Sequence, residues 1–181
     1  MPWSKETDWP LYYKLPDGLA EQYLARLGLP QKAPSKAYLD ELVRQNQLVI
    51  PFENLDSTDL GRPVSIEPPA LVQKLLVERR GGYCFELNGL FYLLLLALGF
   101  DAWLCPCRQL RHGEPCPVPV THCGLLVYVE GEALFCDVGY GGPAPLTSIR
   151  LQPGVDQLVA GEAYRLEHSP IAPGDRRSRK G

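Results

Sequence analysis

The fold is decided by a stretch near the middle of the chain, RGGYCFELNGLFYLLLLALG, which occupies residues 80–99. Gly81 and Gly82 interrupt the pattern before them, and a new helix is expected to begin around Cys84. The second half of this stretch is apolar on nearly every side, which is typical of a helix at the centre of a core. Gly99 ends the helix. The stretch therefore predicts a buried central helix with a cysteine in its first turn.

The sequence before this helix predicts further helices. Asp17 is a candidate N-cap for a helix that Gly28 closes, and Ser35 is a candidate N-cap for a second. The second helix must end before Pro51, because a proline disfavours the helical conformation of the residue before it. A third helix is expected over residues 68–79, with two prolines in its first turn. The N-terminal half of the chain is thus predicted to be helical.

After residue 100 the pattern changes to short apolar runs separated by turn residues, which indicates strands. Strands are expected at residues 102–108, 124–129, 133–138 and 164–167. The middle two flank Gly131 and predict an antiparallel β-hairpin, while residues 112–119 are rich in proline and glycine and predict a loop. We expect an α+β fold, with a helical domain at residues 1–99 and a β domain at residues 100–181.

Composition argues against several classes of protein. The 181 residues suit one large domain or two small ones, and a hydrophobic content of 45% supports a sizeable core. The net charge of −3 offers no general attraction to nucleic acid or to an anionic membrane. The apolar run at residues 90–98 is far shorter than the roughly 20 residues that span a bilayer. The first residues lack the apolar segment of a secretory signal, so we expect a cytoplasmic protein whose six cysteines are reduced.

Cys84 is the first candidate for a reactive group. A cysteine in the first turn of a helix lies where free backbone N–H groups and the positive end of the helix dipole favour thiolate over thiol. Arg79 and Arg80 would act in the same direction if their side chains pointed inward. A buried structural cysteine is the alternative interpretation.

A thiol nucleophile needs a base, and the sequence offers His112, His122 and His168. His122 directly precedes the first hairpin strand, so a rigid element can hold its ring, although a loop-end histidine bonded to a carbonyl is the alternative. Asp137 ends the second hairpin strand, and antiparallel pairing around Gly131 brings its position back toward His122. An acid in an apolar strand needs a partner. Cysteine, histidine and aspartate in this order outline a thiol-based acyl transferase or protease.

Four motifs in a shared order carry a resemblance to one family. They are RGGYCFELN at residues 80–88, PFENLD at residues 51–56, the Thr121-His122 pair before an apolar strand, and DVGYG at residues 137–141. Over about residues 23–145 the chain resembles the arylamine N-acetyltransferases. The resemblance implies a cysteine-protease-like core with a Cys84, His122 and Asp137 triad, and it implies no metal.

The activity that the resemblance implies is a ping-pong transfer with acetyl-CoA as donor. Cys84 would take the acetyl group, His122 would share its proton and Asp137 would hold the ring. The acceptor would be an arylamine, an arylhydrazine or an N-hydroxyarylamine. The resemblance also implies a loop near the CoA phosphates, formed by Gly139, Tyr140 and Gly141. An aryl pocket is expected from Phe52, Arg108 and Phe135.

Other motif residues have structural interpretations. Glu53 lies in an apolar setting and is expected to pair with Arg80 or to cap a helix. Asn88 and Glu86 are expected to bind backbone groups instead of substrate. These residues would then support the site without touching a ligand.

The family normally carries a third region after the sheet, and we expect that region to be absent here. An open thioester would meet water more readily, so hydrolysis of acetyl-CoA is one alternative function. A non-catalytic protein that binds partners is another. Apolar surface left uncovered would favour self-association.

Two further classes compete with this interpretation. A zinc module would draw on the ligands Cys105, Cys107, Cys116, His122, Cys123 and Cys136, although their spacing is poor for a tetrahedral site. A papain-like or transglutaminase-like enzyme would use the same triad on peptides, but it leaves the motif at residues 51–56 unexplained.

Overall fold

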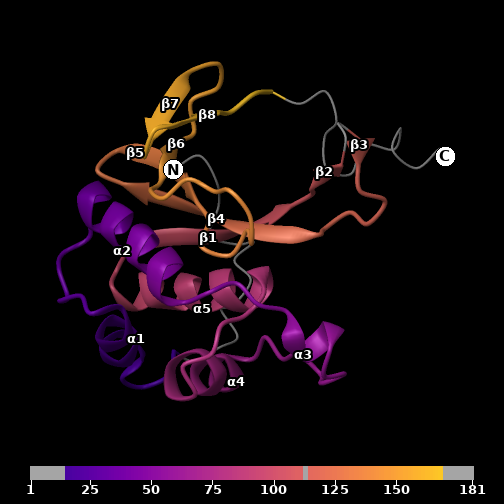
Figure 1. Cartoon of the computed structure of the whole chain (residues 1–181). Helices are drawn as coiled ribbons and strands as arrows, with labels where there is room; N and C mark the ends of the chain where they lie inside the picture. The colour runs from indigo at the N-terminus through magenta and orange to yellow at the C-terminus, as the bar shows by residue number, and fades with distance from the viewer. Residues whose placement is uncertain (1–14, 112–113, 169–181) are drawn as a thin grey trace.

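The computed structural model describes residues 15–111 and 114–168. A layer of helices lies against one face of an antiparallel sheet, and a small hairpin lies above the sheet in this view (Figure 1). Helices from the first half of the chain and antiparallel strands from the second confirm the predicted α+β fold. The division into domains at residues 1–99 and 100–181 stays a prediction.

The helical layer positions the candidate cysteine. Its elements are α1 (Leu19–Leu27), α2 (Lys36–Val49), α3 (Leu55–Thr58), α4 (Pro68–Leu71), the π-helix η2 (Val72–Val77) and α5 (Cys84–Ala97). The predicted central helix is therefore confirmed as α5, which begins at Cys84 itself.

The strands form one main sheet and two small ones. They are β1 (Asp101–Cys107), β2 (Leu110–Arg111), β3 (Glu114–Pro115), β4 (His122–Val129), β5 (Glu132–Cys136), β6 (Ile149–Arg150), β7 (Asp156–Val159) and β8 (Glu162–Arg165). The main sheet has the antiparallel order β1-β4-β5-β6, while β2 pairs with β3 and β7 pairs with β8. The hairpin expected around Gly131 is β4–β5.

One hydrophobic core joins the two layers. α5 packs on β1 and β4, and α1 and α4 pack on α5 from the other side (Figure 1). Leu87, Leu90 and Phe91 of α5 have no exposed surface, and Leu125 of β4 belongs to the same buried cluster. Within residues 15–111 and 114–168, no helix has the length and apolar character that crossing a bilayer requires.

The helix ends follow most of the sequence signals. Ser35 caps α2, because its hydroxyl accepts a hydrogen bond from the Tyr38 N–H at 3.2 Å. Gly28 closes α1 with a left-handed φ of 70°. The Asp17 prediction is wrong, since the N-cap of α1 is Gly18, whose φ of 70° also lies in the left-handed region. A glycine can adopt this turn without the cost that a side chain would add.

The helix expected over residues 68–79 differs from the prediction. After one turn, α4 passes into the π-helix η2, whose wider turns use hydrogen bonds between residues five apart. The segment then ends at Arg79, which has a left-handed φ of 56°. The buried guanidinium of Arg26 donates to the carbonyls of Arg79 and Arg80 at 3.0 and 3.3 Å. The apolar spacing of the sequence does not distinguish such a turn from an α-helix.

The loop predicted at residues 112–119 is wrong in part. Glu114 and Pro115 form β3, paired with β2, while residues 112–113 lie outside the described residues. The strand predicted at residues 164–167 is observed as β8, two residues earlier.

Candidate active site

Cys84 is the first residue of α5 and is 8% exposed. The turn before it runs beside the motif at residues 51–56, since a parallel bridge joins Phe52 to Gly82 and the Gly82 N–H donates to the Pro51 carbonyl at 3.3 Å. Gly81 permits this approach, because a Cβ there would lie 2.1 Å from the Pro51 carbonyl oxygen. Two motifs that are distant in sequence thus form one scaffold that fixes the start of α5.

The β4–β5 hairpin brings His122 and Asp137 together. His122 opens β4, Asp137 follows the last residue of β5, and both residues are buried. Nε2 of His122 lies 2.5 Å from Oδ2 of Asp137. Cys84 lies near enough to this ring to raise the pKa of His122. Of the other histidines, His168 is exposed and His112 lies outside the described residues.

The pKa of His122 is shifted in opposite directions by burial and by its two neighbours. Burial lowers the pKa, but the hydrogen bonds to Asp137 and Cys84, with the charges of these groups, outweigh burial and raise it to about 9. At neutral pH the ring therefore holds a proton and stabilises negative charge on either neighbour. This is the electrostatic setting that a thiolate nucleophile needs.

Asp137 is held in place by further donors. Its Oδ1 accepts from Asn88 Nδ2 and from the Gly139 N–H, both at 2.9 Å. Gln47 of α2 donates to the Asp137 carbonyl at 3.0 Å and to the Pro145 carbonyl at 2.9 Å. The carboxylate is therefore fixed from the helical layer as well as from its own strand.

Asn88 links α5 to both strands of the hairpin. It is completely buried one turn after Cys84, and its Nδ2 also donates to the Cys123 carbonyl at 2.8 Å. Its Oδ1 accepts from the Val138 N–H at 3.0 Å. The expectation that Asn88 binds backbone groups is confirmed at Cys123 and Val138. The sequence did not predict the hydrogen bond from Asn88 to the Asp137 carboxylate.

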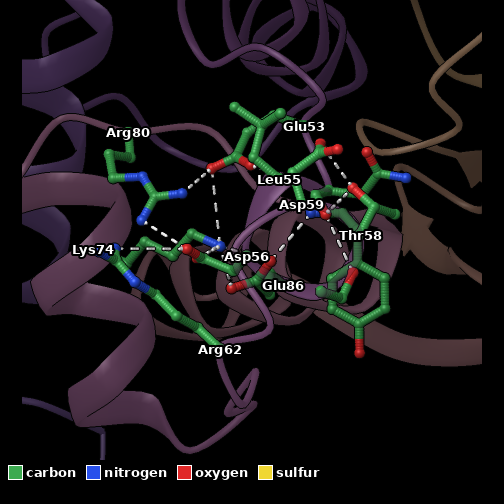
Figure 2. Close-up of polar contacts among 12 residues, drawn as sticks. Glu53, Leu55, Asp56, Thr58, Asp59, Arg62, Lys74, Arg80 and Glu86 are labelled. Atoms are coloured by element: carbon green, nitrogen blue, oxygen red, sulfur yellow. Dashed lines mark hydrogen bonds and ion pairs between the residues drawn. The ribbon is translucent and has the colours of Figure 1, made fainter.

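Five charged side chains form an ionic cluster beside the start of α5 (Figure 2). Lys74 Nζ lies 2.8 Å from Glu86 and 2.9 Å from Asp56. Arg80 binds Glu53 at 2.8 Å and Asp56 at 3.0 Å. The predicted pairing of Glu53 with Arg80 is confirmed.

The ionic cluster stabilises the turn that presents Cys84. Glu86 accepts from the Tyr83 N–H at 3.0 Å, which confirms the expected backbone contact and caps α5. Hydrogen bonds from Lys74 and Arg80 lower the pKa of Asp56. Arg80 thus supports the scaffold through its acidic partners Glu53 and Asp56, and its effect on the Cys84 thiol stays a prediction.

A pocket of about 410 Å³ opens beside His122 and Asp137. Two of the three residues expected in an aryl pocket, Arg108 and Phe135, line it. Its wall is completed by Cys107, Gln109, Leu110, Tyr140, Pro143, Ala144, Pro145, Ile149, Tyr164, Arg165 and Leu166. The wall is therefore mostly apolar and aromatic, and it draws on β8, which the sequence did not connect with the site.

Phe52, the third expected residue, lies elsewhere. It lines a neighbouring pocket of about 250 Å³ together with Gly141, and Tyr140 lines both pockets. The Phe52 ring packs on Gly141, where a Cβ would lie 2.8 Å from the ring. Gly139 packs equally closely, since its Cβ would lie 3.0 Å from the Cα of Cys84. Close packing therefore explains both glycines, and contact with CoA stays a prediction for Gly139, Tyr140 and Gly141.

The cysteines form neither disulfides nor a metal centre in the described part of the chain. All six are free thiols. No group of three or more His, Cys, Asp or Glu side chains in residues 15–111 and 114–168 is arranged to hold a metal ion. The zinc interpretation therefore has no site among these residues.

Comparison with known proteins gives one consistent result. A family model described as N-acetyltransferase matches residues 37–175. An arylamine N-acetyltransferase of Mycobacterium tuberculosis is 41% identical over 140 residues, which are 74% of this chain and 49% of the relative. The arylamine N-acetyltransferase / N-hydroxyarylamine O-acetyltransferase of Salmonella typhimurium is 42% identical over 146 residues, 80% of this chain and 51% of the relative. The chain spans about half the length of these relatives.

Solved structures agree with the sequence relatives. The arylamine N-acetyltransferase structure from Salmonella typhimurium aligns with a TM-score of 0.78 at 39% identity, covering 82% of this chain and 54% of that one. The Mycobacterium marinum arylamine N-acetyltransferase in complex with CoA aligns with a TM-score of 0.77 at 36% identity. The alignment covers 83% of this chain and 57% of that one. Motifs, fold and relatives agree, and the chain belongs to the arylamine N-acetyltransferase family.

Proposed function

We propose that the protein transfers an acetyl group from acetyl-CoA to an arylamine, an arylhydrazine or an N-hydroxyarylamine through a thioester on Cys84. The observation that carries the proposal is the buried His122–Asp137 pair, whose ring lies near enough to Cys84 for that residue to raise the pKa of His122. The names of the relatives support the acceptor class, and the CoA complex of the Mycobacterium marinum protein supports the donor.

In the first half-reaction Cys84 is the nucleophile. Its thiolate attacks the thioester carbonyl of acetyl-CoA, a bond forms from Sγ to the acetyl carbon, and the bond from that carbon to the CoA sulfur breaks. His122, protonated at neutral pH, gives its proton to the departing CoA thiolate. Asp137 keeps the ring oriented throughout. One thioester replaces another, so this step is close to balanced in energy.

In the second half-reaction His122 acts as the base. The neutral imidazole takes the proton of the attacking amine while Cys84 leaves as thiolate, and the site returns to its starting state. The amide product is more stable than the thioester, which drives turnover. An N-hydroxyarylamine would react in the same way through its oxygen.

The 410 Å³ pocket is the proposed acceptor site. Phe135 and Tyr140 offer aromatic surface beside His122, which suits a flat aryl ring that buries its faces and leaves its amine near the acyl carbon. The loop at residues 139–141 is the proposed neighbour of CoA. A cytoplasmic setting, in which free thiols persist, belongs to the same proposal.

Mass spectrometry of the intact protein tests the proposal. On exposure to acetyl-CoA, we expect the mass to rise by one acetyl group, mapped to Cys84, and adding an arylhydrazine should then remove the label. Cys84→Ala should stay unlabelled, and His122→Ala should label far more slowly. Cys116→Ser is the control, because Cys116 is a free thiol that is more exposed than Cys84 and would be labelled first if exposure alone decided the reaction.

The same labelling experiment distinguishes the alternative functions. Loss of the label at the same rate with and without acceptor would identify a hydrolase of acetyl-CoA. A protein that takes no label, or takes it equally in Cys84→Ala, would contradict the proposal and favour a binding role.

A further inference from the structure

Cys105 and Cys107 place two thiols together on β1. Residues two apart on a strand point to the same face, and Pro106 between them fixes the backbone. The Cys107 thiol donates to the Cys105 carbonyl at 3.2 Å, and each thiol shifts the pKa of the other. Both cysteines are partly exposed free thiols. The strand therefore carries two neighbouring thiols in partly exposed residues.

Cys107 lies in the wall of the 410 Å³ pocket, and Cys105 lies two residues before it on the same strand. Cys107 is paired with His122 across β1 and β4, and both line the 410 Å³ pocket. Cys105 is paired with Gly124, and the ring of Phe135 lies over that glycine, where a Cβ would be 2.6 Å from it. A group bound across the two sulfurs would therefore stand next to the ring of His122 and that of Phe135.

The chemistry of the pair suits a soft ligand that takes two thiolates. The hydrogen bond from Cys107 lowers the pKa of Cys105, burial opposes this, and the nearby His122 lowers the pKa further, to about 7. The lowered pKa favours the Cys105 thiolate, and thiolate is the form that binds soft ions. A tetrahedral metal ion would need further protein ligands, and no cluster of three is found in the described residues.

We propose that Cys105 and Cys107 form a dithiol site for organic trivalent arsenicals of the type R–As=O. Both thiols add to one arsenic atom, so two As–S bonds form, the arsenic–oxygen bond breaks, and oxygen leaves as water with the two thiol protons. No electron is transferred, and no oxidant is needed. The rigid strand holds both sulfurs ready, so little ordering opposes the second bond.

Occupation of the dithiol site should block the pocket. The organic group on arsenic would project into space that the acceptor needs beside His122. This consequence, unlike the site itself, rests on the proposed acetyl-transfer function.

The site is tested by mass spectrometry with phenylarsine oxide, in the full chain carrying Cys84→Ala so that the proposed nucleophile does not contribute. In excess glutathione, we expect one adduct, equal in mass to the reagent less one water, and we expect 2,3-dimercaptopropanol to remove it. Adding Cys105→Ser or Cys107→Ser should each abolish the adduct. Adding Cys116→Ser should leave it intact.

A second measurement does not depend on whether the Cys105→Ser and Cys107→Ser variants fold. In the Cys84→Ala chain, the adduct should protect Cys105 and Cys107 from alkylation by iodoacetamide and leave Cys116 reactive. An adduct that survives Cys105→Ser, or that protects Cys123 or Cys136 in its place, overturns the proposal.

The blocking effect is measured in the chain with Cys84 intact, as acetyl transfer relative to the untreated rate of each variant. Phenylarsine oxide should inhibit the parent chain and Cys116→Ser, and inhibit Cys105→Ser several-fold less. Missing transfer in untreated protein refutes the proposed function, whereas a missing adduct refutes the dithiol site, so the two failures are distinguishable.

Discussion

The protonation of His122 links the candidate active site to the folding stability of the chain. Its pKa of about 9 lies above the ordinary value of 6.5, because its bonds to Asp137 and Cys84 outweigh burial. A raised pKa means that the folded chain binds the proton more tightly than the unfolded chain does. The stabilisation is complete below about pH 6.5 and is lost as the pH rises through about 9.

We therefore expect His122→Gln to flatten the decline in unfolding free energy between neutral and alkaline pH. A shift of this size corresponds to roughly 3 kcal/mol for a buried group, which sets the order of magnitude. Urea unfolding of both proteins at about pH 6 and about pH 10 measures the difference.

Comparison with the parent chain is necessary, because other groups also change their pKa on folding. The pKa of Cys105 is lowered and that of its neighbour Cys107 is raised, so both thiols contribute to the pH dependence of the parent chain. Equal pH slopes in the parent and in His122→Gln would contradict the assigned role of His122.

Asn88 is the residue that holds Asp137 from the helix. Asn88→Ala should destabilise the fold by about 1–3 kcal/mol for each buried group that it leaves unpaired, with the Cys123 carbonyl and the Val138 N–H foremost. Asn88→Asp should be worse for labelling of Cys84, since it places a second carboxylate against Asp137. Urea unfolding and the rate of acetyl labelling measure the two effects separately. Equal labelling rates in Asn88→Asp and Asn88→Ala would contradict this assignment.

Among the elements, α5 has one glycine before it that has no room for a side chain, Gly81, and one within it that does, Gly89. Gly81→Ala should destabilise the protein by about 2–3 kcal/mol or more, because its Cβ would meet the Pro51 carbonyl. Gly89→Ala should stabilise it by about 0.5–1 kcal/mol, since Gly89 lies within the helix and its Cβ would make an ordinary 3.6 Å contact with Leu71. Thermal unfolding of both variants measures the effects, and a stable Gly81→Ala would mean that the two motifs do not touch.

The π-helix η2 contributes Lys74 to the ionic cluster. Lys74→Met takes one partner from Asp56, which keeps Arg80, and the only cationic partner from the buried Glu86 among the described residues, so we expect a clear loss of stability. Lys36→Met removes a partly exposed pair with Asp40 and should cost only about 0.3–0.5 kcal/mol. Similar losses in the two variants, measured by urea unfolding, would argue against a structural role for the cluster.

At the scale of the whole molecule, the sequence predicted what depends on local pattern. The uniform apolar run predicted α5, and the turn at Gly131 predicted the β4–β5 hairpin. That hairpin returns the chain after β5 to the start of β4, which was enough to predict His122 and Asp137 as neighbours, although both lie beyond the paired residues 125–129 and 132–136.

What the sequence could not predict depends on contacts between distant segments. Gln47 holds the Asp137 carbonyl across 90 positions of the chain, and an isolated glutamine on a helix carries no sign of this role. The placement of Phe52 in a separate pocket, and of Tyr164 in the main one, follows from how loops and β8 close over the sheet. Such packing is a property of the assembled core and not of any one stretch.

The two halves of the site are held together by contacts of different range. His122 and Asp137 are 15 positions apart and meet through one hairpin, whereas Cys84 is held beside that hairpin by the packing of α5 on β4. A chain that loses this packing would keep the histidine and its acid while the sulfur moved away from them.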